Sequence, residues 1–496
     1  MRSTRLSDRP IVARGVSGQT RSVVRRLSQF VPHQLLLIAS VILFVTVGVG
    51  PNYILVIASI LAFLLGVSWL WRPGETPILL YLFFFQWLQV SLPVFHANWL
   101  GLSLHEYSLL HGNIHLAFFI SLIGLVIVAL GIRLGAKRQS FSVVEISSYQ
   151  GHVISIKRIF WLYLFSFVIA TYTESIVGSF GGLRQILLAF LSIRWALYFV
   201  LAYVSFIQKK VTLHYLGFAF LLEFLISIGG FFSDFKTVFL FTLFAIFATR
   251  VKVSAKQLVV LTALGAFLLF LGVIWSSVKI EYRDYVSGGT GQQVVQAGSV
   301  ERINKLTDMV SALDTGGLSD GFERLLRRTG YIEFFGRVID VVPGHLSHTN
   351  GSIWWDALTR PLMPRLLFPD KASINDTQRT TAYTGVLFQG ATSVSLGYMA
   401  EAYIDFGIYG MMLLLLAYGY VLGRLYKWLI EGRYTHGLLG MGIASSVLFV
   451  ATAFESSATK VIGGVAVSVL VTWSFARWYV PKFSPWLRAR KNSKGY

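Results

Sequence analysis

The sequence has no cysteine and few charged residues. Its 496 residues include no Cys, and Asp, Glu, Lys and Arg together make up 13% of the chain. The absence of cysteine excludes disulfides, thiolate catalysis and metal sites built on cysteine. A soluble protein of this length carries about twice this share of charged residues. With 55% hydrophobic residues, the composition is that of a polytopic membrane protein.

Acidic residues are the scarcer of the two charge classes. The chain has 23 Asp and Glu against 43 Lys and Arg, which gives a formal net charge of +20. In the segments predicted to be cytoplasmic, the only acids are Asp8, Glu75, Glu145 and Glu431. The basic excess therefore follows the positive-inside rule, with anionic lipid headgroups as the counter-charge. We expect no nucleic-acid partner.

Long apolar runs make up most of the chain. A helix of about 20 apolar residues crosses the ~30 Å hydrocarbon core of a bilayer, and short polar connectors separate runs of this length. The sequence therefore predicts an all-α polytopic membrane protein with about 12 transmembrane helices. The predicted spans are residues 34–50, 52–71, 77–95, 114–134, 156–177, 192–207, 211–232, 236–249, 257–276, 398–423, 436–455 and 461–479.

Lys and Arg residues occupy every second connector between these spans. Arg133 and Lys137 lie on the same predicted side as Lys209 and Arg424, whereas the short connectors on the other side hold almost no Lys or Arg. The positive-inside rule then places both termini in the cytoplasm and the segment after the ninth span outside. The predicted domains are a basic cytoplasmic tail (1–33), helices one to nine (34–276), a large periplasmic loop (277–397), helices ten to twelve (398–479) and a second basic cytoplasmic tail (480–496).

Polar residues outside the large loop allow alternative interpretations. The Ser- and Arg-rich residues 1–33 also have the composition of an organellar transit peptide. His111 and His115 are spaced to share a metal ion on a helix, but no HExxH pattern accompanies them, which favours interfacial histidines. Glu223 lies within a predicted span, where a carboxylate is either paired for structural reasons or functional.

The large loop is predicted to be a folded extramembrane module, because its charges balance and it is rich in aromatic and turn residues. Apolar spacing predicts one helix around Leu306–Leu313 and a second that begins at Asp320 and stops at Pro343. The second helix carries a cationic cluster that could bind a diphosphate, since arginine forks match phosphate oxygens. The alternative is a solvated or lipid-facing side of the helix. The cluster consists of Arg324, Arg327 and Arg328.

Further along the loop, polar residues alternate with tryptophans. His348 precedes Trp354 and Trp355, a combination that suits a sugar ring, although tryptophans also mark membrane interfaces. Arg365 and Lys371 follow in a proline-rich segment, which is predicted to be stiff and extended and to present its cations.

Two carboxylates mark the start of the tenth predicted span. Glu401 and Asp405 are four residues apart, so both project from one face of a helix at its outer end. Two like charges held close together raise the pKa of one of them, which favours proton transfer. The alternative is a pair of acids that complement the positive end of the helix dipole.

The region 360–410 resembles the Wzy-type polymerases, which join oligosaccharide repeat units of O-antigen and exopolysaccharide. A Pro-Arg-x-x-x-Pro-x-Lys segment precedes a Gly-x-x-x-Glu-x-Tyr-x-x-Phe-Gly helix entry. The topology of spans and loop resembles that family along the whole chain. The matching residues are Pro364, Arg365, Pro369 and Lys371 in the first motif, and Gly397, Glu401, Tyr403, Phe406 and Gly407 in the second.

This resemblance implies a GT-C-like enzyme at the outer leaflet of the bacterial inner membrane. Its substrates would be oligosaccharides on undecaprenyl diphosphate, with no cofactor and no metal, and its partners a repeat-unit flippase and a chain-length regulator. In such an enzyme cations hold the leaving diphosphate and a base deprotonates the acceptor hydroxyl. The candidate residues are Glu401, then Asp405 and His348, for the base; Arg324, Arg327, Arg328, Arg365 and Lys371 for the diphosphate; and Trp354, Trp355 and Tyr403 for the sugar.

Two other functions fit parts of the sequence. An O-antigen ligase would share the topology and the donor but transfer the glycan to a lipid A core. A lipid-linked oligosaccharide flippase or transporter would fit the number of spans and Glu223, but the two halves of the chain show no internal repeat. Polymerisation remains the favoured prediction.

Overall fold

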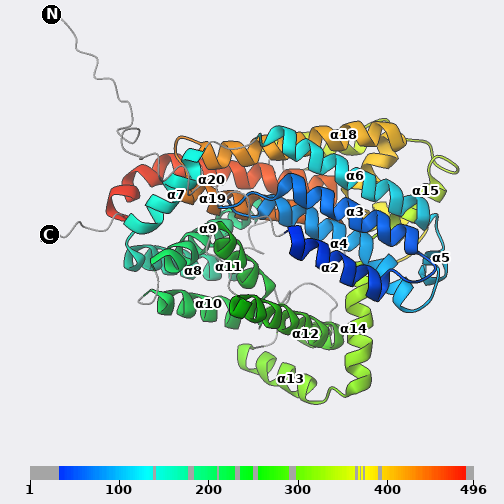
Figure 1. The fold of residues 1–496 in the computed structure, drawn as a ribbon, viewed down its shortest axis with the longest axis horizontal. Helices are drawn as coiled ribbons and strands as arrows, with labels where there is room; N and C mark the ends of the chain where they lie inside the picture. The colour runs from blue at the N-terminus through cyan, green and yellow to red at the C-terminus, as the bar shows by residue number, and fades with distance from the viewer. Residues whose placement is uncertain are drawn as a thin grey trace, which may run out of the picture.

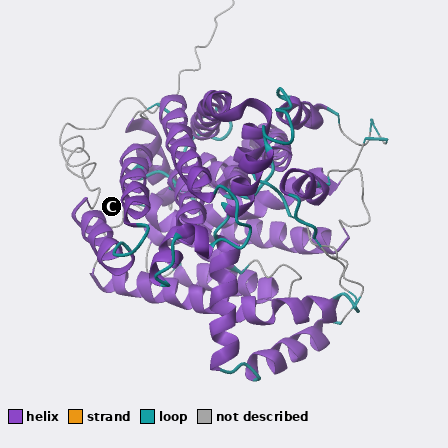
Figure 2. Ribbon diagram, turned by 90° about the vertical axis from the view of Figure 1, so that its right-hand side faces the viewer, coloured by secondary structure: helices purple, strands orange, loops and turns teal. Residues whose placement is uncertain are grey.

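The computed structural model is a bundle of helices (Figure 1). It describes residues 33–137, 141–176, 184–208, 212–228, 235–249, 255–289, 296, 298–363, 367–368, 370–371, 375–388 and 394–487. Every regular element in these residues is helical, so Figure 2 shows no strand in the part of the chain it describes. The all-α prediction is therefore confirmed, and the predicted tails 1–33 and 480–496 fall largely outside the described residues.

The helices form three groups along the chain. Before the large loop they are α2 (His33–Val47), α3 (Tyr53–Leu70), α4 (Ile78–Trp99), α5 (Leu104–Tyr107), α6 (Ile114–Gly135), α7 (Phe141–Val153), α8 (Ile156–Ile176), α9 (Arg184–Gln208), α10 (Leu213–Ile228), α11 (Lys236–Ala248) and α12 (Ala255–Val286). The loop contains α13 (Ser299–Ser311), α14 (Thr315–Thr329), α15 (Glu333–Val341), α16 (Ser352–Thr359), η2 (Arg360–Leu362) and α17 (Asp376–Thr384). The last group is α18 (Tyr398–Glu431), α19 (Leu438–Leu448), η3 (Phe449–Thr452) and α20 (Ala458–Leu487).

Seven helices in the described residues are long and apolar enough to cross a membrane, so the protein is a helical membrane protein. Three shorter apolar helices accompany them, at Leu213–Ser227, Lys236–Ala248 and Leu438–Thr452. Twelve spans therefore remain a prediction. The seven lie at Tyr53–Leu70, Ile78–Trp99, Ile114–Gly135, Ile186–Gln208, Thr262–Val286, Tyr398–Glu431 and Ala458–Phe483.

Helices α6 and α18 run side by side and their backbones touch (Figure 1). A Cβ atom added to Gly131 would overlap the Leu416 carbonyl oxygen, and one added to Gly419 would overlap the Val128 carbonyl oxygen. Gly131 begins a small-xxx-small pair with Gly135, and Gly419 begins one with Gly423. Such pairs allow close helix packing in lipid, where van der Waals contact drives association.

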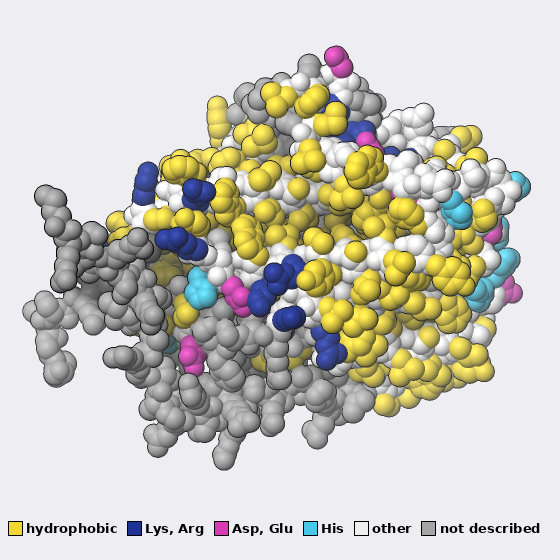
Figure 3. Space-filling view, turned by 90° about the horizontal axis from the view of Figure 1, so that it is seen from above, with side chains coloured by type: hydrophobic (Ala, Val, Ile, Leu, Met, Phe, Trp, Pro, Cys, Tyr) yellow, Lys and Arg dark blue, Asp and Glu magenta, His cyan; other side chains and the backbone are white. Residues whose placement is uncertain are grey.

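Charge differs between the two ends of the bundle. The helix α7 and the last turns of α20 lie at one end, and α5 and α15 lie at the other (Figure 1). On the face shown in Figure 3, most visible Lys and Arg side chains gather toward the α7 end, and His side chains gather at the opposite end. An apolar surface fills most of the area between them. We call the α5 and α15 end the histidine end.

The large loop is not a detached module. Helix α12 continues past the predicted boundary at residue 277 to Val286, and loop helices then pack onto the membrane helices. Gly330, after α14, lies against Pro93 of α4, and Gly336 of α15 lies against Ile114 of α6. The second loop helix also differs from its prediction: α14 begins at Thr315, where Asp314 accepts a hydrogen bond from the Gly317 amide (2.7 Å), and a separate helix, α15, follows it.

Glu223 on α10 is paired inside the bundle. Its Oε1 atom lies 3.4 Å from Arg194 Nε on α9 and accepts a hydrogen bond from the Tyr163 hydroxyl (3.0 Å). Arg194 also lies 3.5 Å from Glu174. Of the two alternatives for Glu223, the structure favours the structural pair, because a charge buried among apolar helices needs such partners.

Candidate functional site

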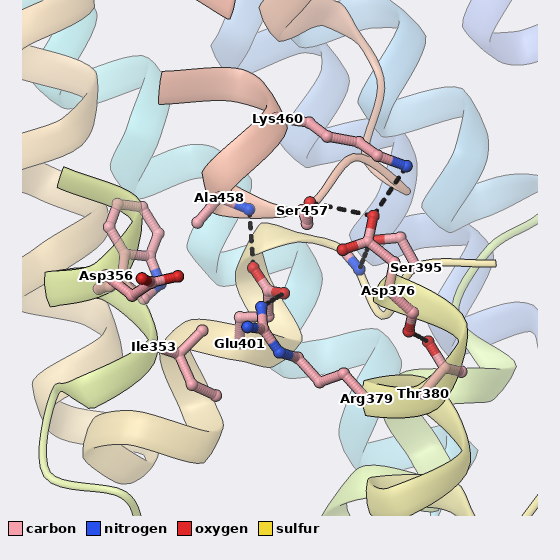
Figure 4. Close-up of polar contacts among 12 residues, drawn as sticks. Ile353, Asp356, Asp376, Arg379, Thr380, Ser395, Glu401, Ser457, Ala458 and Lys460 are labelled. Carbon is pink, nitrogen blue, oxygen red and sulfur yellow. Dashed lines mark hydrogen bonds and ion pairs between the residues drawn. The ribbon is translucent and has the colours of Figure 1, made fainter. Parts of the chain in front are cut away.

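A network of charged side chains lies where α17, the start of α18 and the start of α20 meet (Figure 4). Its members come from segments far apart in the sequence, and α16 and the Phe454–Ser457 turn lie beside it. We call it the charge network. Its central residues are Asp376, Arg379, Glu401 and Lys460.

Glu401 is the most enclosed member of the network, with 1% of its side chain exposed. One carboxylate oxygen accepts from Arg379 Nη1 at 2.8 Å, and the other accepts from the backbone amide of Ala458 at 2.7 Å. Ala458 is the first residue of α20, so the carboxylate also lies at the positive end of that helix. Both oxygens are therefore occupied, and Glu401 fixes Arg379 relative to α20.

Asp376 is the second buried carboxylate, with 2% of its side chain exposed. Its Oδ2 atom accepts from Lys460 Nζ at 2.7 Å and from the Ser457 hydroxyl at 3.3 Å. Its Oδ1 atom is buried and, within the described residues, has no hydrogen-bond partner. Buried polar atoms are rarely left unpaired, so this oxygen can accept a hydrogen bond from a donor outside the described residues.

The two cations of the network are less buried than the carboxylates. The side chain of Arg379 is 25% exposed and that of Lys460 is 48% exposed. Burial lowers the pKa of Arg379, but the carboxylates of Glu401, Asp376 and Asp356 outweigh this and raise it above its usual value. Arg379 therefore stays charged while part of its side chain is exposed. Two fixed and partly exposed cations are suited to bind phosphate oxygens.

A tyrosine and a glutamate border the network. The Tyr331 hydroxyl donates to the Ser395 carbonyl oxygen, and burial raises the pKa of Tyr331, with a further contribution from the Glu455 and Asp376 charges. Glu455 accepts from the Gln89 side-chain amide, whose oxygen accepts from the Phe454 amide at 2.7 Å. Tyr331 is therefore a protonated, neutral neighbour of two carboxylates.

Asp405 does not share a site with Glu401. Its carboxylate accepts from the Thr349 hydroxyl and from the backbone amides of Ile353 (3.1 Å) and Trp354 (2.8 Å) in the first turn of α16. It thus caps α16 as Glu401 caps α20. The prediction that Glu401 and Asp405 form a pair of like charges is therefore wrong. Each carboxylate accepts a backbone hydrogen bond from the first turn of a different helix.

His348 packs edge-on against Tyr403, with 5.8 Å between the ring centroids, but most of the predicted sugar-binding side chains are enclosed. His348 Nδ1 lies 3.1 Å from the Ile404 carbonyl oxygen, and the Tyr403 hydroxyl donates to the Val342 carbonyl oxygen (2.9 Å). Tyr403 and Trp354 are buried, 5% and 4% exposed, and Trp354 packs edge-on against Tyr418. Only Trp355, 69% exposed, offers an accessible ring.

The three predicted diphosphate-binding arginines of α14 have different neighbours. Arg324 lies 3.8 Å from Asp320, and Arg327 pairs with Glu323 at 2.8 Å. The guanidinium of Arg327 also stacks over the Tyr107 ring, 4.7 Å from its centroid. Arg328 is exposed and turned toward α12, as described below. All three belong to α14, and none has a contact with the charge network in the described residues.

Of the two cations predicted in the proline-rich segment, the structure describes Lys371 but not Arg365. Lys371 Nζ donates to the carbonyl oxygens of Arg360 (2.6 Å) and Met363 (2.8 Å), so it stabilises the turn η2. Arg365 lies outside the described residues, and its role stays a prediction. In the described part of the chain, no group of three His, Asp or Glu residues is arranged to hold a metal ion.

The sequence analysis missed Asp376, Arg379 and Lys460. One signal could have identified Lys460: it lies in a short connector on the predicted outer side, where Lys and Arg are almost absent. A cation retained on that side needs a partner, which Asp376 supplies. Asp376 and Arg379 have no comparable local signal, because their partners lie in α18 and α20.

The charge network lies within a region shared with other proteins. A family described as a domain of unknown function, DUF8712, matches residues 115–469. No curated protein and no solved structure matches the chain. The matched region contains every central residue of the charge network, together with α6 to α19.

Proposed function

This chain belongs to the DUF8712 family, and we propose that it is a membrane-embedded glycosyltransferase that polymerises oligosaccharide units carried on a lipid diphosphate. The observation that carries the proposal is the charge network: two partly exposed cations, Arg379 and Lys460, each held by a buried carboxylate where α17, α18 and α20 meet. Such a site suits a leaving group that gains negative charge.

In the proposed reaction, a hydroxyl oxygen of the acceptor sugar attacks the anomeric carbon of the donor unit. The bond between that carbon and the diphosphate oxygen breaks, and the diphosphate leaves with the electron pair. Arg379 and Lys460 bind its oxygens. The hydroxyl proton passes to Asp376, whose Oδ1 atom has no partner among the described residues.

Glu401 has a positioning role in this proposal. Both of its oxygens are occupied by Arg379 and Ala458, so it holds the guanidinium in place for the diphosphate. This differs from the base role that the spacing of Glu401 and Asp405 suggested. Trp355 and Arg365 remain the proposed contacts to sugar and phosphate from the rest of the loop.

The architecture proposed for this function is GT-C-like. Helices α2, α8, α10, α11 and α19 add to the seven apolar helices to give twelve spans. The histidine end faces the periplasm, with both termini in the cytoplasm of a bacterium whose inner membrane holds the protein. Undecaprenyl-diphosphate-linked units are the substrate class, and a flippase and a chain-length regulator are the proposed partners.

Deleting the gene and examining the surface glycan tests this function. Loss of a polymerase leaves single repeat units on the surface. Loss of a flippase leaves no surface units, and loss of a ligase leaves long chains on the carrier lipid; either result would refute polymerisation. Complementation with the Glu401→Gln or Arg365→Ala variant is expected to leave single units, at unchanged membrane levels of the protein.

A further inference from the structure

Helices α12, α13 and α14 form a unit that stands apart from most of the bundle (Figure 1). The unit has a small core of its own, made of Val278, Tyr282, Val286 and Met309. Only 11% of the residues in the most apolar stretch of α12 are buried. Its exposed apolar side chains include Phe267 and Phe270, 46% and 51% exposed, which lipid would cover in a bilayer.

Helix α14 crosses the outward end of α12 at close range. The Ser277 hydroxyl donates to the Gly317 carbonyl oxygen at 3.0 Å, and a Cβ atom on Gly321 would overlap Ser277. This crossing fixes the side chains of α14 relative to the last turns of α12. The end of the apolar run therefore coincides with a rigid junction between two helices.

Cations from three helices gather at this junction. Lys279 and Arg283 are one turn apart on α12, so they share a face. The charges of Arg328 on α14 and of Lys236 at the start of α11 both act on Lys279, as does that of Arg283. Arg328 also acts on Arg283. We call these four residues the junction cations.

Three acidic residues of this unit are paired with other partners. Asp320 pairs with Arg324, Glu323 with Arg327, and Glu281 with Lys305 on α13. In the part of the chain that the structure describes, neither Lys279 nor Arg328 has an ion pair or a hydrogen bond. Like charges at close range repel, so Lys279 and Arg328 favour an anion that neutralises them.

We propose that the junction cations bind the phosphate group of an anionic membrane lipid. Lys279 is half-buried and follows directly on the apolar run of α12, so a bilayer around that run would place its ammonium group near the lipid phosphates. Arg328 is exposed and adds a fork that can bind two phosphate oxygens. A phosphodiester headgroup and a lipid diphosphate share this chemistry. The proposal does not depend on the proposed function, because the charge network belongs to other helices.

Lipid retention by the whole purified protein tests the site. Native mass spectrometry would compare the wild-type protein with the Lys279→Gln/Arg328→Gln variant after exchange into phosphatidylglycerol, phosphatidylcholine or a polyisoprenyl diphosphate. We expect the wild type to retain the anionic lipids and the variant to bind them at least about tenfold more weakly, with phosphatidylcholine unaffected. Preference for the diphosphate over phosphatidylglycerol would identify the headgroup class within the proposal.

The matched control is Lys305→Gln, which removes a cation of the same unit that already pairs with Glu281. The site is supported if the anionic lipid is retained by this control and by Lys279→Arg/Arg328→Lys and is lost only from the double Gln variant. Equal retention by the double Gln variant and the wild type would overturn it. So would equal loss in the Lys305 control, or displacement of the lipid by an equimolar amount of inorganic pyrophosphate.

Discussion

The charge network and the junction cations differ in whether their positive charges have acidic partners. At the network, Arg379 and Lys460 are each matched by a buried carboxylate, and the helix start at Ala458 provides further stabilisation. At the junction, Lys279 and Arg328 have no acidic partner among the described residues. Matched charges can be buried and held in one geometry, whereas unmatched charges stay near the surface, where they can bind an anion.

The largest effect is expected when one member of a matched ion pair is removed. Arg379→Ala leaves the Glu401 carboxylate buried without its cation, which costs about 3–5 kcal/mol of unfolding free energy. We expect a large fall in Tm and no chain growth. Thermal unfolding in detergent and an elongation assay with lipid-linked oligosaccharide would measure both.

A double variant separates the charge from the fold. Arg379→Ala with Glu401→Gln removes both charges, so its loss of stability should be smaller than the sum of the two single losses, while chain growth stays absent. Strictly additive losses would show that the two side chains are not coupled.

The second prediction concerns Asp376, the carboxylate with an unpaired oxygen. Asp376→Asn keeps the size of the side chain but cannot accept the proton, so we expect kcat to fall about 10²–10⁴-fold with a smaller change in KM. Steady-state kinetics with defined acceptor concentrations would show the split. Unchanged kcat would remove Asp376 from the reaction.

The third prediction distinguishes Asp405 from Glu401. Because Asp405 caps α16 through backbone amides, Asp405→Asn retains an accepting oxygen and Asp405→Ala does not. We expect the Ala variant to lose about 0.5–2 kcal/mol of stability and the Asn variant less. Both should extend chains. Loss of chain growth in a stably folded Asn variant would instead return Asp405 to the list of reacting groups.

The smallest effect is expected from giving the junction an acidic partner. Arg328→Glu places a carboxylate beside Lys279 and Arg283, and this exposed pairing should raise stability by about 0–1 kcal/mol. At the same time, the protein should no longer bind the anionic lipid, because the new carboxylate neutralises the cations of the site. Lipid bound at the wild-type level would show that charge does not govern the junction.

The sequence predicted the helical, membrane-embedded class because length and apolarity are local properties. It also predicted a cationic α14, but the register of that helix disperses its arginines: Arg327 stacks on Tyr107, and Arg328 turns toward Lys279. The start of α14 was predicted five residues late, since Gly316 and Gly317 concealed the cap at Asp314. Glycine is a poor helix former, although Gly321 is required where α14 crosses Ser277 of α12.

The candidate site could be predicted only in part, for a related reason. Glu401 was identified from its place in a helix entry, and its partners Arg379 and Ala458 come from α17 and α20. Spacing along one helix cannot show that Glu401 and Asp405 serve different neighbours. Gly407, at φ 62°, interrupts α18 just after them, so this short entry segment is oriented separately from the rest of the helix.

The glycine contact between α6 and α18 has a consequence for how a substrate enters. Where two backbones touch along Gly131, Gly135, Gly419 and Gly423, no space remains for an acyl or isoprenoid tail to slide between them. That flank of the protein is sealed against the hydrocarbon phase. In the proposed reaction, the tail of a lipid diphosphate bound at Arg379 would therefore leave the protein along another side of the bundle.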